Sequence, residues 1–219
     1  MISRATYQFL ADLAENNHKL WFDAHREAYE AARQGFISFI SKLIKGIEDF
    51  DHHLEGLTAE ECVFRLYRDA RYATDKEPYR AHFGAYIAFG GRNSDFAGYY
   101  VHIAPGDNYI GGGMYNPGTA VLRKIRQEID YNSEPLWNIL RSEGFRECFG
   151  SIQGNRLNSA PQGYPKDHKD IELLKLESYF AIHSMNDEDF TSEKAFERCI
   201  KVVNELYHFN RFFNETFVS

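Results

Sequence analysis

The spacing of the apolar residues changes from helical to alternating at about residue 60, and this change restricts the class of fold. Phe36, Ile40 and Leu43 recur at the three- and four-residue intervals of one helix face. In HFGAYIAF (82–89), apolar residues instead stand at every second position, as they do on one face of a strand. Because one chain carries both periods in separate segments, the sequence predicts an α+β fold.

Three alternating segments follow one another, with short turn sequences between them. They span 83–89, 98–104 and 108–115, and the connections GGRNSD and PGDN are rich in glycine, asparagine and aspartate. Such residues favour tight turns, so the three segments should be consecutive antiparallel neighbours. We expect further strands at CVFRLY (62–67) and SYFAIHS (178–184), giving a central antiparallel sheet of about four to six strands.

Helices are expected before and after this sheet. The first fifty residues have helical spacing, with Trp21 and Phe22 on the apolar stripe of a second helix and Gly35 as a point of bending or breakage. The segment PLWNILRSEGF is predicted to form a helix that ends at Gly144. The last twenty or so residues carry Phe196, Ile200, Val203 and Leu206 at the spacing of a long C-terminal helix.

The length suits one domain over residues 1–219, with a helical N-terminal part at 1–50 and a sheet-centred part at 60–219. Hydrophobic residues make up 43% of the chain and aromatic residues 16%, which is enough for a packed core.

Charge, hydropathy and cysteine content narrow the classes of partner. The net charge of −7 repels nucleic acid, and the chain has no long basic run to offset it. No segment approaches the roughly 20 apolar residues of a membrane span, so no membrane partner is expected. The three cysteines are odd in number and far apart, a pattern typical of free thiols in a reducing compartment. A cytoplasmic protein is therefore expected, and its oligomeric state stays open.

The stretch YRDARYATDKEPYR (67–80) concentrates charge at the start of the predicted sheet. The stretch contains four cations, and Arg65 lies just before it. Together they are five candidate ligand-binding residues: Arg65, Arg68, Arg71, Lys76 and Arg80. Arginine presents a planar fork of donors that matches a carboxylate or a phosphate. The pattern indicates a site for a small anionic molecule, with Asp69 as a candidate catalytic base.

A structural interpretation of the same stretch is equally open. Arginines placed between acids often form a network of salt bridges on a surface turn, and Pro78 would then end the turn. In that case the protein would be a non-catalytic interaction or structural module. The two hypotheses differ in one observable, because a ligand site requires cations that the neighbouring acids leave unpaired beside a cleft.

His102, in YYVHIAP, alternates with Val101 and Ile103 and should lie on the less apolar face of the sheet. A histidine there is a candidate acid–base catalyst, and a hydrogen-bonded structural histidine is the alternative. We predict no metal centre, because no cysteine or histidine set has the spacing of a closed site. We predict no cofactor either, since GGGMYNP matches neither the phosphate-binding loop nor the dinucleotide fingerprint.

Several longer motifs carry a resemblance to a known family. They are FLADLAENNHKLWFDAHREAYE, RDARYATDKEPYRAHFGAYIA, GYYVHIAPGDNYIGGGMYNP and APQGYPKDHKDIELLKLESY. Together they resemble the family catalogued as domain of unknown function 2461, and the resemblance covers nearly the whole chain. It implies a shared fold but no reaction, because no reaction is assigned to the family.

The resemblance also places the family's polar pattern on this chain. Its positions fall on Asn17, Arg26, Arg68, Asp69, Arg71, Asp75, Lys76, Tyr79, Arg80, His102, Gly112, Asp167 and His168. Arg80 stands where the family more often has lysine, which keeps the positive charge. Glu177 stands where lysine is usual before Ser178, and this reversal of charge argues against a shared role at that position.

Overall fold

A computed structural model of the chain describes residues 1–68 and 77–217. The candidates Asp69, Arg71 and Lys76 lie outside the described residues. The N-terminal half of the described chain contains α1 (Arg4–Glu15), α2 (Lys19–Ala24), α3 (Arg26–Glu48), η1 (His52–Leu54), α4 (Ala59–Cys62), β1 (Phe83–Ile87), η2 (Gly91–Asn93) and β2 (Gly98–Ile103). The remainder contains β3 (Asn108–Met114), α5 (Thr119–Asn132), α6 (Glu134–Arg141), α7 (Glu143–Phe149), α8 (Ile171–Leu174), β4 (Tyr179–Met185), α9 (Asp187–Thr191) and α10 (Ala195–Glu215).

The four strands form one antiparallel sheet in the order β1-β2-β3-β4. Val101 of β2 is paired with Ala85 of β1 on one side and with Ile110 of β3 on the other. Gly111 of β3 is paired with Ile182 of β4. The predicted α+β class, the antiparallel order of the three central strands and the long C-terminal helix are therefore confirmed.

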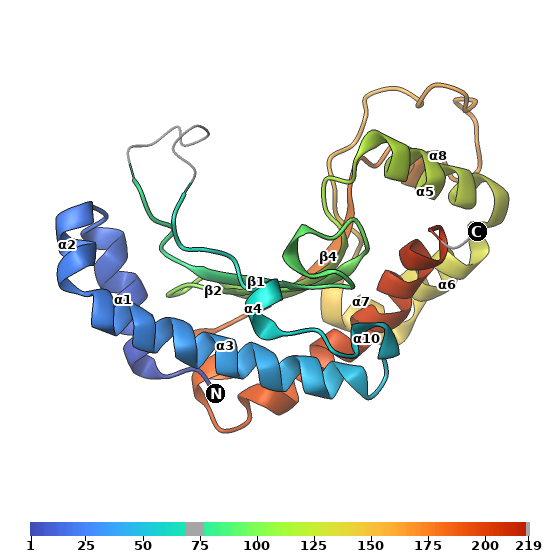
Figure 1. The fold of residues 1–219 in the computed structure, drawn as a ribbon. Helices are drawn as coiled ribbons and strands as arrows, with labels where there is room; N and C mark the ends of the chain where they lie inside the picture. Colours follow the sequence, from blue (N-terminus) through green and yellow to red (C-terminus); the bar gives the residue numbers. More distant parts are fainter. Residues whose placement is uncertain (69–76, 218–219) are drawn as a thin grey trace.

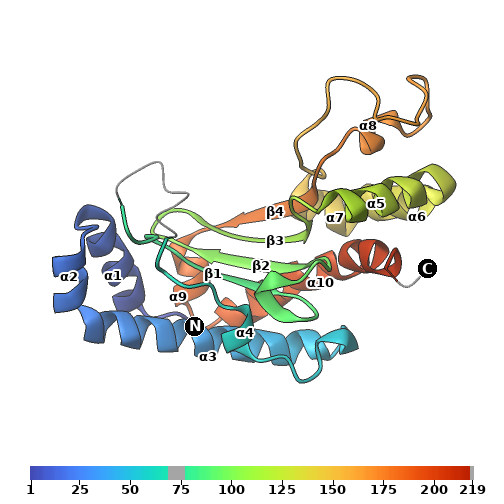
Figure 2. The ribbon, with the colours of Figure 1, turned by 45° about the horizontal axis from the view of Figure 1, so that its top comes forward.

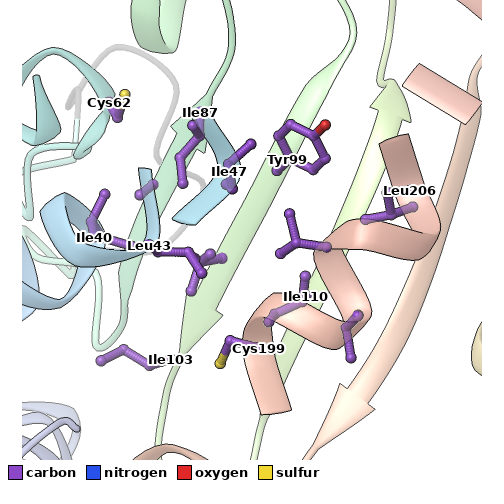
Figure 3. Close-up of a cluster of buried hydrophobic side chains, with 14 of the residues drawn as sticks. Ile40, Leu43, Ile47, Cys62, Ile87, Tyr99, Ile103, Ile110, Cys199 and Leu206 are labelled. Carbon is purple, nitrogen blue, oxygen red and sulfur yellow. The ribbon is translucent and has the colours of Figure 1, made fainter. Parts of the chain in front are cut away.

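Helices α3 and α10 cover one face of this sheet and lie side by side upon it (Figures 1 and 2). Between them and the strands lies a core of fully buried side chains (Figure 3), including Leu43, Ile103, Ile110 and Leu206. Every second residue of each strand points into this core, which is the physical basis of the alternating pattern in the sequence. Helices α1 and α2 stand at one end of the sheet and α5 to α7 at the other (Figure 1).

Gly112 allows α10 to approach the sheet closely. A Cβ atom at this position would lie 2.9 Å from Leu206 Cδ1 and 3.1 Å from Asn210 Oδ1. Contacts this short exceed normal van der Waals approach, so a side chain here would push α10 away from β3. Because Gly112 has no Cβ, side chains of α10 pack directly against the backbone of β3.

Three local expectations are corrected by the structure. Residues 62–67 do not form a strand: Cys62 is the last residue of α4, which the capping box of Thr58 and Glu61 begins, and after it the segment makes the isolated bridges Val63–Ala85 and Tyr67–Tyr79. Gly35 does not interrupt α3, which is continuous from Arg26 to Glu48. Gly144 does not end a helix but lies inside α7, because Ser142 caps a new helix with its side chain.

The apolar stripe of the second helix is only partly buried. Phe22 is fully buried, whereas Trp21 and Tyr29 are half-buried against the core. Phe22 stacks on Tyr79, with ring centroids 4.1 Å apart, and thereby fastens the N-terminal helices to the segment that leads into β1. Within the described residues, no helix is both long and apolar enough to cross a membrane.

Candidate functional site

The sheet face that α3 and α10 leave uncovered carries a cavity of about 540 Å³. Side chains that alternate with the core residues form its floor, namely Tyr86, Tyr100, Tyr109, Phe180 and Ile182. Phe64, Arg80, Arg92, Phe96, Tyr115 and Asn116 contribute to its walls. The volume is in the range of small-molecule sites, which are commonly concave and rich in aromatic side chains with a few polar groups.

Two glycines keep this floor open. Gly111 and Gly113 line the cavity between the tyrosines, and neither adds a side chain to it. A Cβ at Gly111 would lie 2.8 Å from the carbonyl oxygen of Ala181. Gly113 has a φ of +110°, which other residues rarely adopt. The triple glycine therefore serves two faces of β3: a Cβ at Gly112 or Gly113 would meet side chains of α10, whereas a Cβ at Gly111 would meet β4 beside the cavity.

Arg80 brings a positive charge to the cavity wall. Two short segments position it, since the Arg80 amide donates to the Leu66 carbonyl at 2.8 Å and the Arg68 amide donates to the Pro78 carbonyl at 3.0 Å. The Arg80 side chain is half-buried. Within residues 1–68 and 77–217 it forms no ion pair with a carboxylate.

The other described members of the cation cluster are placed differently. Arg68 approaches Glu77, with Nη2 and Oε2 3.6 Å apart, and Arg65 is exposed. Arg71 and Lys76, like the acid–base candidate Asp69, fall outside the described residues. Of the five predicted ligand-binding cations, Arg80 is thus the one that the described structure places on the cavity wall.

His102 lies on the uncovered face of β2, beside Tyr100 and Tyr109, which line the cavity. It is 7% exposed and is enclosed between two rings. The His82 ring centroid lies 4.4 Å away on one side, and Tyr109 stacks at 4.5 Å, nearly parallel, on the other. The imidazole edge faces two polar groups: Tyr100 Oη lies 3.4 Å from Nδ1, and Asp107 Oδ2 lies 4.0 Å from Nε2.

Burial sets the protonation of this group of residues. It lowers the pKa of His102, and the carboxylate of Asp107 opposes that effect. The pKa of His82 falls to about 4 chiefly because the ring is buried, and positive charge on His102, when it is protonated, and on Arg80 and Arg68 lowers it further. Burial and the neighbouring Tyr109 raise the pKa of Tyr100, while Arg80 acts in the opposite direction. At neutral pH both histidines and Tyr100 are therefore uncharged beside the Arg80 cation.

At the end of the cavity away from Arg80, the polar side chains are held by hydrogen bonds to backbone carbonyls. Arg92 donates to the carbonyls of Glu60 and Glu61, at 2.9 and 3.1 Å, so its guanidinium ties η2 to α4. The hydroxyl of Tyr86 donates to the Phe96 carbonyl at 2.8 Å. Because strand register separates Gly113 from Tyr109 along β3, this end lies opposite the Arg80 end of the cavity.

The sequence-based reasoning missed the tyrosines of the floor. Tyr100 has the same strand parity as His102, and Tyr86 and Tyr109 follow the same alternation on β1 and β3. That parity was a usable signal, because three tyrosines on one face of neighbouring strands must lie close together. In the described part of the chain, no group of three or more histidine, cysteine, aspartate or glutamate side chains is placed to hold a metal ion.

Comparisons with known proteins identify the family of this chain through a family model. A search of curated proteins and a search of solved structures give no match. One family model, described as "Conserved hypothetical protein (DUF2461)", matches residues 5–212. The match includes the whole sheet and every lining residue of the cavity. The chain therefore belongs to the DUF2461 family of conserved hypothetical proteins.

Proposed function

We propose that the protein binds a small organic anion in the cavity on the uncovered face of the sheet. The observation that carries this proposal is the half-buried Arg80 guanidinium on a cavity wall, without an ion-pair partner in the described residues. A cation removed in part from water loses solvation, and a bound carboxylate or phosphate would restore that loss.

The aromatic floor indicates that the ligand also has an apolar, flat part. Tyr86, Tyr100 and Phe180 present rings, and Gly111 and Gly113 leave backbone uncovered between them. Rings attract other rings at offset or edge-on geometry, by about 0.5–1.5 kcal/mol for each pair beyond the area they bury. A ligand with an acid group near Arg80 and a ring over the glycines would use both features.

A structural role remains the second candidate for the rest of the cation cluster. Arg68 approaches Glu77, and Arg92 binds two backbone carbonyls, so both arginines serve contacts between segments. Exposed pairs such as Arg68–Glu77 contribute little to stability, on the order of 1 kcal/mol or less. We therefore assign ligand binding to Arg80 and assign the other two arginines to architecture.

Thermal unfolding tests the binding proposal directly. We expect benzoate or phenyl phosphate, added separately, to raise the unfolding temperature of the wild-type protein, since a ligand that binds only the folded state stabilises it. The two compounds distinguish a carboxylate site from a phosphate site.

The variant Arg80→Met should lose this response, while Arg80→Lys should keep part of it because it retains the charge without the fork. Arg146→Met is the matched control, because Arg146 is an exposed arginine on α7 away from the cavity. The proposal is wrong if neither compound stabilises the wild type, or if Arg80→Met responds as the wild type does.

We also propose a cytoplasmic location. Cys62, Cys148 and Cys199 are all free, and burial raises the pKa of each thiol, to about 11 for Cys148. Free thiols that are buried, as in Cys62 and Cys199, or partly buried, as in Cys148, suit a reducing compartment. Fractionation of cells that express the native chain would test this, and recovery outside the cytoplasm would contradict it.

A further inference from the structure

We propose that Tyr100 is a catalytic acid–base residue, that His102 positions it and accepts its proton, and that together they move a proton on the anion bound at Arg80. This inference rests on the proposed binding function, because the reaction requires the ligand in the cavity. It adds an enzymatic activity to a site that would otherwise only bind.

The first argument is position. Tyr100 and Arg80 both line the cavity, and the Arg80 charge is close enough to act on the Tyr100 hydroxyl. Among the described residues His102 is not part of the lining, but its Nδ1 lies 3.4 Å from the hydroxyl oxygen of Tyr100, a lining residue. A catalytic group, a base behind it and a third group that orients the base form the arrangement by which many enzymes activate a hydroxyl.

The second argument is that the structure holds the Tyr100 hydroxyl in place. Gly84 stands opposite His102 in the strand pair, and a Cβ at Gly84 would lie 2.7 Å from Tyr100 Oη. The missing side chain therefore makes the room in which the hydroxyl sits. Phe64 packs against the Tyr100 ring at 6.3 Å in an edge-on geometry. The residue pattern thus directs the phenol oxygen of this lining residue over Gly84 and toward His102.

The third argument is the state of His102. The groups that face it are Tyr100, Asp107, Tyr109 and His82, of which only the Asp107 carboxylate is charged at neutral pH. With its proton on Nε2, toward Asp107, the neutral ring presents Nδ1 as an acceptor to Tyr100. The 3.4 Å separation between Tyr100 Oη and Nδ1 is long for a hydrogen bond. Unliganded catalytic hydrogen bonds are often long and shorten when substrate binds.

The ligand class that fits all of these groups is an aromatic 2-oxo acid. Its carboxylate matches the Arg80 fork, and its ring matches the aromatic floor. The carbon next to its carbonyl carries the acidic hydrogen that acid–base chemistry needs.

The step moves two protons in a relay and transfers no net electrons. The phenol oxygen of Tyr100 takes the proton from the ligand carbon, while the Tyr100 proton passes to His102 Nδ1. The electron pair of the broken C–H bond forms the enolate, whose negative charge lies near Arg80, and His102 becomes the matching cation. The reverse transfer restores the carbon acid, and in D₂O it delivers deuterium.

The experiment follows deuterium uptake at the benzylic carbon of phenylpyruvate by ¹H NMR in D₂O, above the rate in buffer alone. We expect the wild-type protein to accelerate exchange. Tyr100→Phe should lose at least about tenfold of the protein-dependent rate, since general acid–base catalysis typically contributes 10²–10⁴-fold. Tyr131→Phe is the control, because Tyr131 is 89% exposed and stands outside the lining.

A pH profile tests the positioning role of His102. The wild-type rate should fall as pH drops below the ordinary histidine pKa of about 6.5, because a protonated His102 can no longer accept the Tyr100 proton. In His102→Gln the remaining rate should lose this acidic limb. A slow variant that keeps the wild-type profile would mean that His102 is merely structural.

Calorimetric titration of phenylpyruvate into the same proteins separates the two proposals. Binding to Tyr100→Phe with wild-type affinity, but without exchange, supports the catalytic role. Equal exchange rates in wild type and Tyr100→Phe overturn it and leave the binding function intact. If the wild type binds phenylpyruvate but does not accelerate exchange, the catalytic role is likewise overturned and the binding function stands. Absence of binding to the wild type overturns both.

Discussion

Asn17 and Tyr79 exchange two hydrogen bonds across 62 residues of sequence. Asn17 Nδ2 donates to the Tyr79 carbonyl at 2.9 Å, and the Tyr79 amide donates to Asn17 Oδ1 at 3.1 Å. An asparagine amide can thus pair with an extended segment as a neighbouring strand would. Because Tyr79 precedes Arg80, this clamp fixes the backbone from which the Arg80 side chain reaches the cavity.

Replacing Asn17 with alanine should therefore affect both stability and binding. We expect Asn17→Ala to lower the free energy of unfolding by about 1–3 kcal/mol, because two partly buried backbone groups lose their partners. Urea denaturation would measure this, with Asn138→Ala as the control at an exposed position on α6. If the two variants are equally stable, the clamp contributes nothing to the fold.

Two glycines should respond in opposite directions to the same substitution. Gly112→Ala places a Cβ 2.9 Å from Leu206 Cδ1 and should destabilise the protein by about 1–3 kcal/mol. Gly35→Ala lies on the exposed side of α3, where the nearest atom is 4.0 Å away, and should stabilise it by about 0.5–1 kcal/mol. Thermal denaturation of both variants tests this pair. A stabilised Gly112→Ala would refute the close approach of α10.

Acid should weaken the fold partly through His82. Its pKa is lowered from 6.5 to about 4, so the unfolded chain binds a proton between these values and the folded protein does not. This contribution is present above pH 6.5 and is lost as pH falls toward 4. Between pH 7 and pH 4, we expect the free energy of unfolding to fall by roughly 1–3 kcal/mol less in His82→Gln than in the wild type.

Denaturation curves at several pH values measure this difference between His82→Gln and the wild type. His208→Gln is the control at an exposed histidine on α10. The same acid loss in wild type and His82→Gln would show that His82 is not the group responsible.

Local periodicity predicted the sheet, because each strand buries one face in the core and its apolar residues therefore recur at every second position. It did not predict the segment 62–67, where Cys62 belongs to the helix that the capping box of Thr58 and Glu61 begins and the following residues make isolated bridges in place of a strand. Capping is a competition between side chain and backbone that hydrophobic spacing does not report.

The candidate site was only partly predictable. The density of charge drew attention to the cations of 65–80, but their separate roles depend on tertiary contacts, such as the approach of Arg68 to Glu77. The floor of the cavity lies where Gly111 and Gly113 stand between tyrosines of different strands. That arrangement depends on the strand register, which the sequence constrains only through the alternation.

A comparison of two ligands of the same shape and different charge tests the central claim most directly. Calorimetric titration with phenylacetate and with uncharged phenylacetamide isolates the anion, because both carry the same ring and chain. We predict that the wild-type protein binds phenylacetate at least about tenfold more tightly, a difference of roughly 1.4 kcal/mol. In Arg80→Met, this preference should disappear. Equal affinities in the wild type, or a preference that survives in Arg80→Met, would contradict the assignment of this cavity as an anion site.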